Sequence, residues 1–346
     1  MTGHDTGNTF SNPHADGPDS DPSVRWTFDA GGKPLDHHRY YTPLIVDGTV
    51  YCPAARDGEK GSLVAIDAGT GDFETVIETD PYLWKPTIVD GTVYAMLGPV
   101  VAAFDLESGE QLWQSDPIGW VASLRYVDGT LIGSKGDIIA GIDATSGEIL
   151  WRDTTDMIGS GVVFPVRADQ TVCNFGAEYL RSATTGIVRS ALPEPVNYPV
   201  LEQGRLYGQT FEKFFALNWE TLAVEWEYVP DDGFDPLGGF AGVIGETIIV
   251  EVWDSDSNRS FVGLDRDTGQ RRWKRSHDDL STMFVATDQT TAYVVSPSYP
   301  PTALDPQTGD IKWQFERDPD VYGAGVALAE DLLVVAGGQG NVWALE

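Results

Sequence analysis

A repeated turn phrase constrains the fold of this chain more than any other feature. In one copy Ala103-Phe104-Asp105 leads to Ser108-Gly109-Glu110 and then to Trp113. A period of roughly 40 residues is typical of arrays and propellers, so one supersecondary unit is predicted to recur along the chain. The repeat positions are Asp67, Gly71, Asp105, Gly109, Trp113, Asp143, Gly147, Trp151, Trp226, Asp265, Gly269, Trp273, Asp305, Gly309 and Trp313, with weaker copies around Ser182 and Asn218.

The spelling of the phrase predicts a strand, a tight turn and a second strand. An Asp side chain accepts hydrogen bonds from turn N–H groups two residues on, and Gly takes the positive φ that closes such a turn. The Trp then lies on the second strand. A large indole there is interpreted as a packing element between adjacent sheets, in preference to a platform for a ligand.

A second phrase doubles the number of strands in each unit. Val46-Asp47-Gly48-Thr49 and Val89-Asp90-Gly91-Thr92 both place Asp-Gly between two apolar runs, which is a strong hairpin signal. Four strands per unit, repeated eight times, predict an all-β, eight-bladed propeller of four-stranded antiparallel blades.

The two ends of the chain each carry half of a unit. Trp26 lies in a strand that has no preceding turn, whereas the phrase that begins at Asn341 stops at Glu346, before its turn. The last blade is therefore predicted to close by pairing of the N- and C-terminal strands, in one propeller domain over residues 24–346. Residues 1–23 are rich in Gly, Asp, Asn, Ser and Pro and are predicted to form a flexible acidic tail.

The phrase Ala-x-Asp-x-x-Ser/Thr-Gly-x-x-x-Trp resembles the tryptophan-docking motif of PQQ-like β-propellers. That superfamily includes quinoprotein alcohol dehydrogenases and BamB-like scaffold propellers. The resemblance covers residues 24–346. The opening Gly3-His4-Asp5-Thr6-Gly7 is similar to PQQ-repeat proteins of halophilic archaea, and the resemblance implies a protein of that type.

The charge of the chain excludes some partners. Asp and Glu number 53 against 22 Lys and Arg, which gives a net charge of −31. Nucleic acids and anionic membranes are polyanions, so neither is expected as a partner. Spread over turns and loops, the acids are interpreted as a surface adapted to high salt. No signal or transmembrane segment is recognised, so the chain is cytoplasmic as written, or exported if an upstream signal was removed.

The enzymes of the PQQ-like superfamily hold PQQ with a Ca²⁺ ion. The resemblance implies this cofactor only if the chain is a diverged quinoprotein dehydrogenase. Their adjacent cysteine pair has no counterpart, because Cys52 and Cys173 lie far apart. Glu178, Asn197 and Asp235 are scattered polar residues that do not reproduce the Ca²⁺ ligand set. No cofactor, no metal site and no catalytic residue are predicted from the sequence.

Ligand-binding residues are expected where each outer strand leads into the next inner strand, at the mouth of the central funnel. Aromatic and polar side chains that converge in a concavity are the default ligand-site hypothesis, although they could equally pack the funnel rim. The candidates are His37, Arg39, Tyr40, Trp84, Lys85, Trp120, Tyr198, Asp235 and Tyr322.

Two functions remain open at this point. The first is a non-catalytic, monomeric binding scaffold that presents its funnel and loops to a protein or a small molecule. The second is a diverged quinoprotein dehydrogenase.

Overall fold

A computed structural model describes residues 15–30, 43–54, 61–80, 83–119, 123–135, 138–154, 163–167, 170–173, 177–230, 240–253, 259–277, 284–296, 299–315, 323–329, 331–337 and 341–346. Every regular element in these ranges is a β-strand, and neighbouring strands in each sheet pair antiparallel. Among the described residues there is no apolar helix with the length of a membrane span.

Six of the sheets have four strands each. In chain order their strands are β2 (Leu44–Val46), β3 (Thr49–Ala54), β4 (Gly61–Asp67) and β5 (Phe73–Thr79); β6 (Leu83–Val89), β7 (Thr92–Leu97), β8 (Val100–Asp105) and β9 (Gln111–Gln114); β10 (Ser123–Val127), β11 (Thr130–Lys135), β12 (Ile138–Asp143) and β13 (Ile149–Thr154); β21 (Phe240–Ile244), β22 (Thr247–Trp253), β23 (Arg259–Asp265) and β24 (Arg271–His277); β25 (Phe284–Thr287), β26 (Ala292–Ser296), β27 (Tyr299–Leu304) and β28 (Ile311–Gln314); and β29 (Gly323–Ala329), β30 (Leu332–Gly337), β31 (Asn341–Leu345) and β1 (Val24–Asp29).

The seventh sheet corrects the predicted number of blades. It has seven strands, so the described strands form seven sheets and the prediction of an eight-bladed propeller is wrong. Its strands are β14 (Val163–Arg167), β15 (Gln170–Cys173), β16 (Ala177–Ser182), β17 (Val188–Glu202), β18 (Arg205–Gln209), β19 (Phe214–Asn218) and β20 (Val224–Tyr228).

The reason for the difference is the length of β17, which spans 15 residues. Its first part pairs with β16 through Ser190 and Ala191, and its last part pairs with β18 through Val200 and Leu201. Prolines favour extended backbone in the residues before them. Pro193 and Pro195 lie in this strand and favour extended backbone before them, so two repeat units share one continuous strand where a loop was expected.

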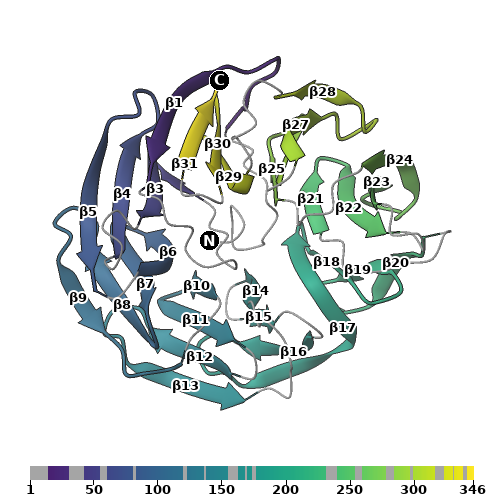
Figure 1. The fold of residues 1–346 in the computed structure, drawn as a ribbon. Coiled ribbons are helices and arrows are strands. Elements are labelled where there is room, and N and C mark those ends of the chain that lie inside the picture. The colour runs from purple at the N-terminus through teal and green to yellow at the C-terminus, as the bar shows by residue number, and fades with distance from the viewer. Residues whose placement is uncertain are drawn as a thin grey trace.

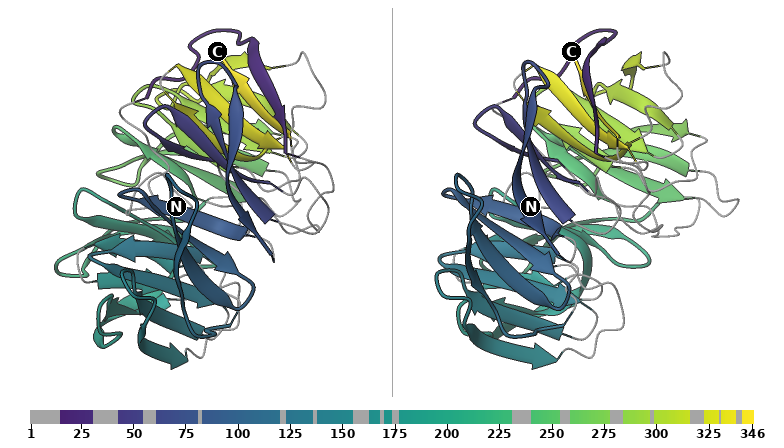
Figure 2. Two further views of the ribbon diagram at one scale, coloured as in Figure 1. Left: turned by 90° about the vertical axis from the view of Figure 1, so that its left-hand side faces the viewer. Right: turned by 60° about the vertical axis from the view of Figure 1, so that its left-hand side comes forward.

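The sheets are arranged around a central axis (Figure 1). Their inner strands contact one another in the sequence β2, β6, β10, β14, β17, β21, β25, β29 and then β2 again, which closes the ring. β14 and β17 both belong to the seven-stranded sheet. The sheet that contains both chain ends is completed by β1, which pairs antiparallel with β31 from Val24 opposite Leu345 to Asp29 opposite Asn341. In both views of Figure 2 the purple β1 lies close to the yellow C-terminal strands. The predicted pairing of the N- and C-terminal strands is therefore present.

The core lies between the faces of neighbouring sheets, where one cluster joins each pair. Val50 and Ile66 of one sheet, for example, pack with Val334 and Val342 of the sheet beside it. Middle strands are buried on both faces, as in β30, whereas outer strands alternate between buried and exposed residues, as in β1. This pattern is what radially packed antiparallel sheets require, because both faces of the middle strands are covered.

Residues 15–23, part of the predicted tail, pack against the ring. Ala15 is buried in the cluster that contains Tyr293 and Trp313. The Gly17 N–H donates to Asp288 at 3.3 Å, and Ser23 exchanges backbone hydrogen bonds with Glu346 at 2.9 Å in both directions. The remainder of the predicted tail, residues 1–14, lies outside the described residues.

Candidate binding surfaces

The repeated Asp organises a turn through its own side chain. Asp67 Oδ1 accepts the N–H groups of Gly69 and Thr70 at 3.0 and 2.8 Å, and the Gly71 N–H donates to the Asp67 carbonyl at 2.8 Å. These hydrogen bonds favour the charged carboxylate and hold the pKa of Asp67 below its ordinary value. Gly71 has a φ of 77°, so the turn needs a residue that tolerates the left-handed region.

Each repeated Trp docks on the turn of the next sheet. The Trp113 Nε1–H donates to the Ala144 carbonyl at 3.0 Å, and the Trp151 Nε1–H donates to the Ala183 carbonyl at 2.8 Å. The ring lies over the next turn's Gly so closely that a Cβ on Gly147 would be 2.5 Å from Trp113 Cε3. Trp26, Trp226 and Trp273 make the same hydrogen bond, to Ala68, Arg266 and Pro306 respectively.

The last docking partner comes from the other end of the chain. The Trp313 Nε1–H donates to the Pro18 carbonyl at 2.7 Å. Residues 15–23 therefore provide for Trp313 the carbonyl that the repeated turn provides for the other Trp side chains. Sequence reasoning missed this role because the segment carries no Asp-x-x-Thr-Gly phrase.

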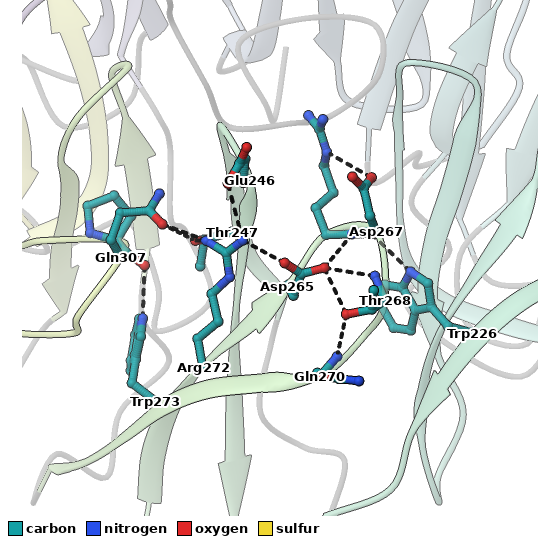
Figure 3. A network of polar contacts seen from close by, with 12 residues as sticks. Trp226, Glu246, Thr247, Asp265, Asp267, Thr268, Gln270, Arg272, Trp273 and Gln307 are labelled. Carbon is teal, nitrogen blue, oxygen red and sulfur yellow. Dashed lines mark hydrogen bonds and ion pairs between the residues drawn. The ribbon is translucent and has the colours of Figure 1, made fainter.

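Ion pairs reinforce the turn side of the ring (Figure 3). Arg272 contacts Asp265 Oδ2 at 2.6 Å within its own sheet and Gln307 Oε1 at 2.5 Å in the turn of the next sheet. The Arg272 hydrogen bond lowers the pKa of Asp265 to about 2. Arg205 links Glu225 to Asp267 of the next sheet in a similar way. These polar contacts hold adjacent sheets together and are interpreted as structural.

Two outer strands have no Trp at the docking position, four residues after the turn Gly. By sequence spacing Thr75 takes this position after Gly71, and Ser190 takes it after Gly186. In the pairing of β4 with β5, however, Glu74 lies opposite Ala65, where other sheets have Trp, and Thr75 lies opposite Val64. Opposite Ser190 the turn has Leu222 at the position of Gly, with a φ of 56°, and this side chain packs into the neighbouring cluster. Leu222 therefore fills space that an indole occupies elsewhere.

The junction opposite Thr75 keeps its Gly and remains partly open. The backbone of β5 lies directly against Gly109, where an added Cβ would be 2.2 Å from the Val76 carbonyl oxygen. Beyond that contact a groove of about 550 Å³ runs between β5 and the β8–β9 hairpin. Figure 1 shows β5 and β9 as neighbours on the outer rim of the ring.

The groove has an apolar floor and polar walls. Leu97, Val100 and Phe104 line it and are each less than a tenth exposed. Glu78 and Asp80 are exposed at the end of β5. Gln111 and Gln114 line the opposite wall on β9 and are also exposed.

Most of the funnel-mouth candidates lie outside the described residues. These are His37, Arg39, Tyr40, Trp120, Asp235 and Tyr322, and the side chain of Lys85 is not described either. Trp84 is half-buried and packs against the cluster that contains Tyr94 and Met96. Tyr198 lies in β17 with a φ of 49°, at a register shift in its pairing with β18.

Tyr198 is near a buried charged cluster that sequence reasoning also missed. Burial, and then the charge of Glu251, raise the pKa of Tyr198. Glu251 Oε1 lies 3.4 Å from Arg259 and 3.4 Å from His277 Nε2, and all three side chains are less than a tenth exposed. Arg259 also stacks on Trp253, 3.8 Å from its ring centre. No motif marks this cluster, because its members come from three strands.

Two of the three residues compared with the superfamily's Ca²⁺ ligands, Glu178 and Asn197, lie in the described ranges. There, His, Cys, Asp and Glu side chains do not gather in threes as a metal site would require. Glu178 is exposed and Asn197 is buried, while Asp235 is not described. Because the set is incomplete in the described ranges, no chemical step through PQQ is derived.

Comparison with known proteins connects this geometry to a family. The family model described as outer membrane protein assembly factor BamB matches residues 19–153, 98–294 and 257–346. The chain belongs to this PQQ-like, BamB-type propeller family. No curated protein sequence matches the chain.

Solved structures support the propeller fold of this BamB-type chain. BamB from Moraxella catarrhalis has a TM-score of 0.71 and 14% identity, over 94% of this chain and 99% of that one. The quinohemoprotein alcohol dehydrogenase from Comamonas testosteroni has a TM-score of 0.70 and 12% identity, over 99% of this chain and 79% of that one. A europium-containing methanol dehydrogenase has a TM-score of 0.69 and 12% identity, over 98% of this chain and 88% of that one. At these identities the likeness establishes the fold alone.

Proposed function

We propose that this BamB-type propeller is a non-catalytic scaffold that holds a protein partner on its outer rim. The observation that supports this role is the open junction between β5 and β9. At the other described junctions between neighbouring repeat units, an indole or Leu222 fills the space. The groove is therefore a local departure from a repeated packing rule, with apolar surface accessible from outside.

The repeat residues themselves favour a scaffold. Asp67, Asp105, Asp143 and Asp265 serve their own turns, and the Trp side chains serve the neighbouring sheets. Each of these groups is thus engaged in the packing or the turns of the propeller itself. The family description names an assembly factor, and this supports a partner of the protein class.

A capture experiment with a groove variant tests the scaffold role. The purified chain would be immobilised in molar KCl and exposed to extract of the source cells, and retained proteins would be identified by mass spectrometry. We expect a specific protein on the wild type and a loss of at least tenfold on Gln114→Trp, in which an exposed groove residue is enlarged. The control is Gln314→Trp on β28, next to Trp313, and a melting curve would verify its fold because Gln314 is half-buried and donates to Thr302. Retention of no specific protein would contradict the scaffold role.

The same preparation distinguishes the quinoprotein alternative. PQQ and Ca²⁺ would be added at saturation, followed by alcohols or sugars and a redox dye. Under the scaffold proposal we expect no stoichiometric quinone binding and no dye reduction. Turnover with PQQ would replace the proposal with a dehydrogenase function.

High-salt adaptation is a second part of the proposal. With a net charge of −31, self-repulsion destabilises the compact state in dilute buffer, and it is screened over about 3 Å at 1 M salt. We expect unfolding in dilute buffer and refolding in molar KCl, followed by Trp fluorescence. Stability that does not change with salt would contradict this adaptation.

A further inference from the structure

We propose that the groove between β5 and β9 binds an extended peptide segment of the partner that combines apolar and basic side chains. This inference rests on the proposed scaffold function and specifies its site and ligand chemistry. It is carried by the shape of the groove, the residues that line it and the sheet edges that border it.

The shape of the groove favours an elongated ligand. Its lining begins at Gly109, in the turn between β8 and β9, and follows β9. It ends at Pro99 and Val100, at the loop between β7 and β8. The turn and the hairpin loop lie at opposite ends of β8. A strand-like segment would follow this length, whereas a compact molecule would fill only a part of it.

The floor of the groove provides apolar contacts. Phe104, Leu97 and Val100 are 3%, 7% and 9% exposed, so they are fixed in the core of their sheet. A preformed apolar surface of this kind binds aliphatic or aromatic side chains without a large ordering cost.

The polar rim determines the charge of the ligand. Glu78 and Asp80 are exposed at one end of the groove, and none of its described lining residues is a Lys or an Arg. The pair would attract a Lys or Arg of the ligand, and the acidic protein as a whole would accelerate the encounter. An acidic segment would be repelled.

Main-chain hydrogen bonding completes the case for a peptide. β5 and β9 are the terminal strands of their sheets, so each has one edge without a partner strand in its own sheet. Extended peptides add to such edges through backbone hydrogen bonds, while pockets select alternate side chains. Leu112 of β9 is 55% exposed and would add apolar contact beside this edge.

Fluorescence anisotropy with defined peptides tests the proposal. The probe is a labelled heptapeptide that alternates Leu with Lys, and the comparison peptide has Glu in place of Lys. The full chain would be used at the lowest KCl concentration that gives a cooperative melting curve, and again in 2 M KCl. We expect saturable binding of the Lys peptide, no binding of the Glu peptide, and weaker binding in 2 M KCl because of screening.

Charge variants locate the binding site. The double variant Glu78→Lys/Asp80→Lys is expected to weaken Lys-peptide binding at least tenfold. Asp116→Lys is the matched control, because Asp116 follows Gly109 at the same spacing as Glu78 follows Gly71 and is also exposed, but borders a junction filled by Trp113. We expect binding within twofold of the wild type for this control. Melting curves would verify that each variant is folded.

Several results would overturn the proposal. One is no binding of the Lys peptide by the folded wild type at 1 mM, and another is an equal loss for the double variant and for Asp116→Lys. A concentration-dependent dimer that Gln114→Trp abolishes would identify a second copy of this chain as the occupant. If the cell extract yields a partner but the Lys peptide does not bind, the groove proposal fails. The scaffold role is then retained, and the partner binds a different surface.

Discussion

Two neighbouring junctions in the ring use the same turn in different ways. Between the sheets of β9 and β13, the Trp113 indole lies over Gly147 and donates to the Ala144 carbonyl. Between the sheets of β5 and β9, β5 has Thr75 in place of Trp at the same sequence spacing and a different strand register, and the Val76 backbone contacts Gly109. The first junction is closed by a large side chain. The second leaves a groove, so the turn alone does not fill the space between sheets.

The largest expected effect concerns a filled junction. Trp273→Ala should lower the free energy of unfolding by about 3–5 kcal/mol, because a buried aromatic is lost and a cavity remains. Trp273 is 9% exposed and donates to the Pro306 carbonyl at 2.9 Å. Thr75→Ala, at the corresponding position of the open junction, should cost less than about 1 kcal/mol. Urea unfolding in molar KCl measures both, and similar values would contradict the difference between the junctions.

The Gly beneath the indole provides a second comparison. Gly147→Ala should cost about 2–4 kcal/mol, because the new Cβ would be 2.5 Å from Trp113 and the φ is 78°. Gly91→Ala isolates the backbone term, since Gly91 has a φ of 75° and nothing within 4 Å of an added Cβ. We expect about 1–2 kcal/mol for that control. Equal unfolding midpoints for the two variants would mean that the Trp113 indole can shift away from the added Cβ without a loss of stability.

Leu222 tests whether a side chain from the turn can replace the indole. Leu222→Gly relieves a left-handed backbone and removes a half-buried side chain, so the net change should be within about 1 kcal/mol. The removed volume should leave a new groove beside Ser190, which a crystal structure of the variant would reveal. If β17 instead moved to fill the space left by Leu222, no groove would form beside Ser190. The absence of an indole would then not be sufficient to explain the groove between β5 and β9.

The smallest expected effect is on the pH dependence of stability. Asp265 has an ordinary pKa of 3.8, which Arg272 lowers to about 2 in the folded chain. Its contribution to stability is therefore complete above about pH 4 and is lost as the pH falls toward 2. Asp265→Asn should remove this part of the acid transition and lower the unfolding midpoint at pH 7, where the wild-type carboxylate makes its full contribution, whereas near pH 2 the two proteins should be similar. Acid titrations of both proteins, monitored by circular dichroism, measure it; identical curves would contradict the ion pair.

The sequence predicted the unit but not the number of sheets. Asp-Gly hairpins and the Asp-x-x-Thr-Gly turn act over a few residues, so their positions follow from local chemistry. The count failed at β17, because Pro193 and Pro195 favour an extended chain where a loop was expected. One extended strand can form hydrogen bonds with one neighbouring strand along its first part and with another along its last part. No local sequence pattern indicates that this will happen.

The candidate sites show the same division. Aromatic residues at the expected funnel mouth could be found by spacing, but Trp84 packs in a core cluster. The groove exists because no indole covers Gly109. The residue at the sequence position of that indole, Thr75, lies 34 residues before Gly109, so a local pattern does not reveal the gap. The cluster around Glu251 likewise combines three strands.

The sequence by itself determined the all-β repeat, the positions of the turns and the pairing of the two ends, because each depends on residues that are close in the chain or complementary in pattern. The tertiary structure alone decided how each junction is filled, that residues 15–23 serve as the docking partner of Trp313, and that two units merge into one sheet. Packing between sheets is a contact between distant segments, and its outcome depends on volumes that the sequence pattern does not encode.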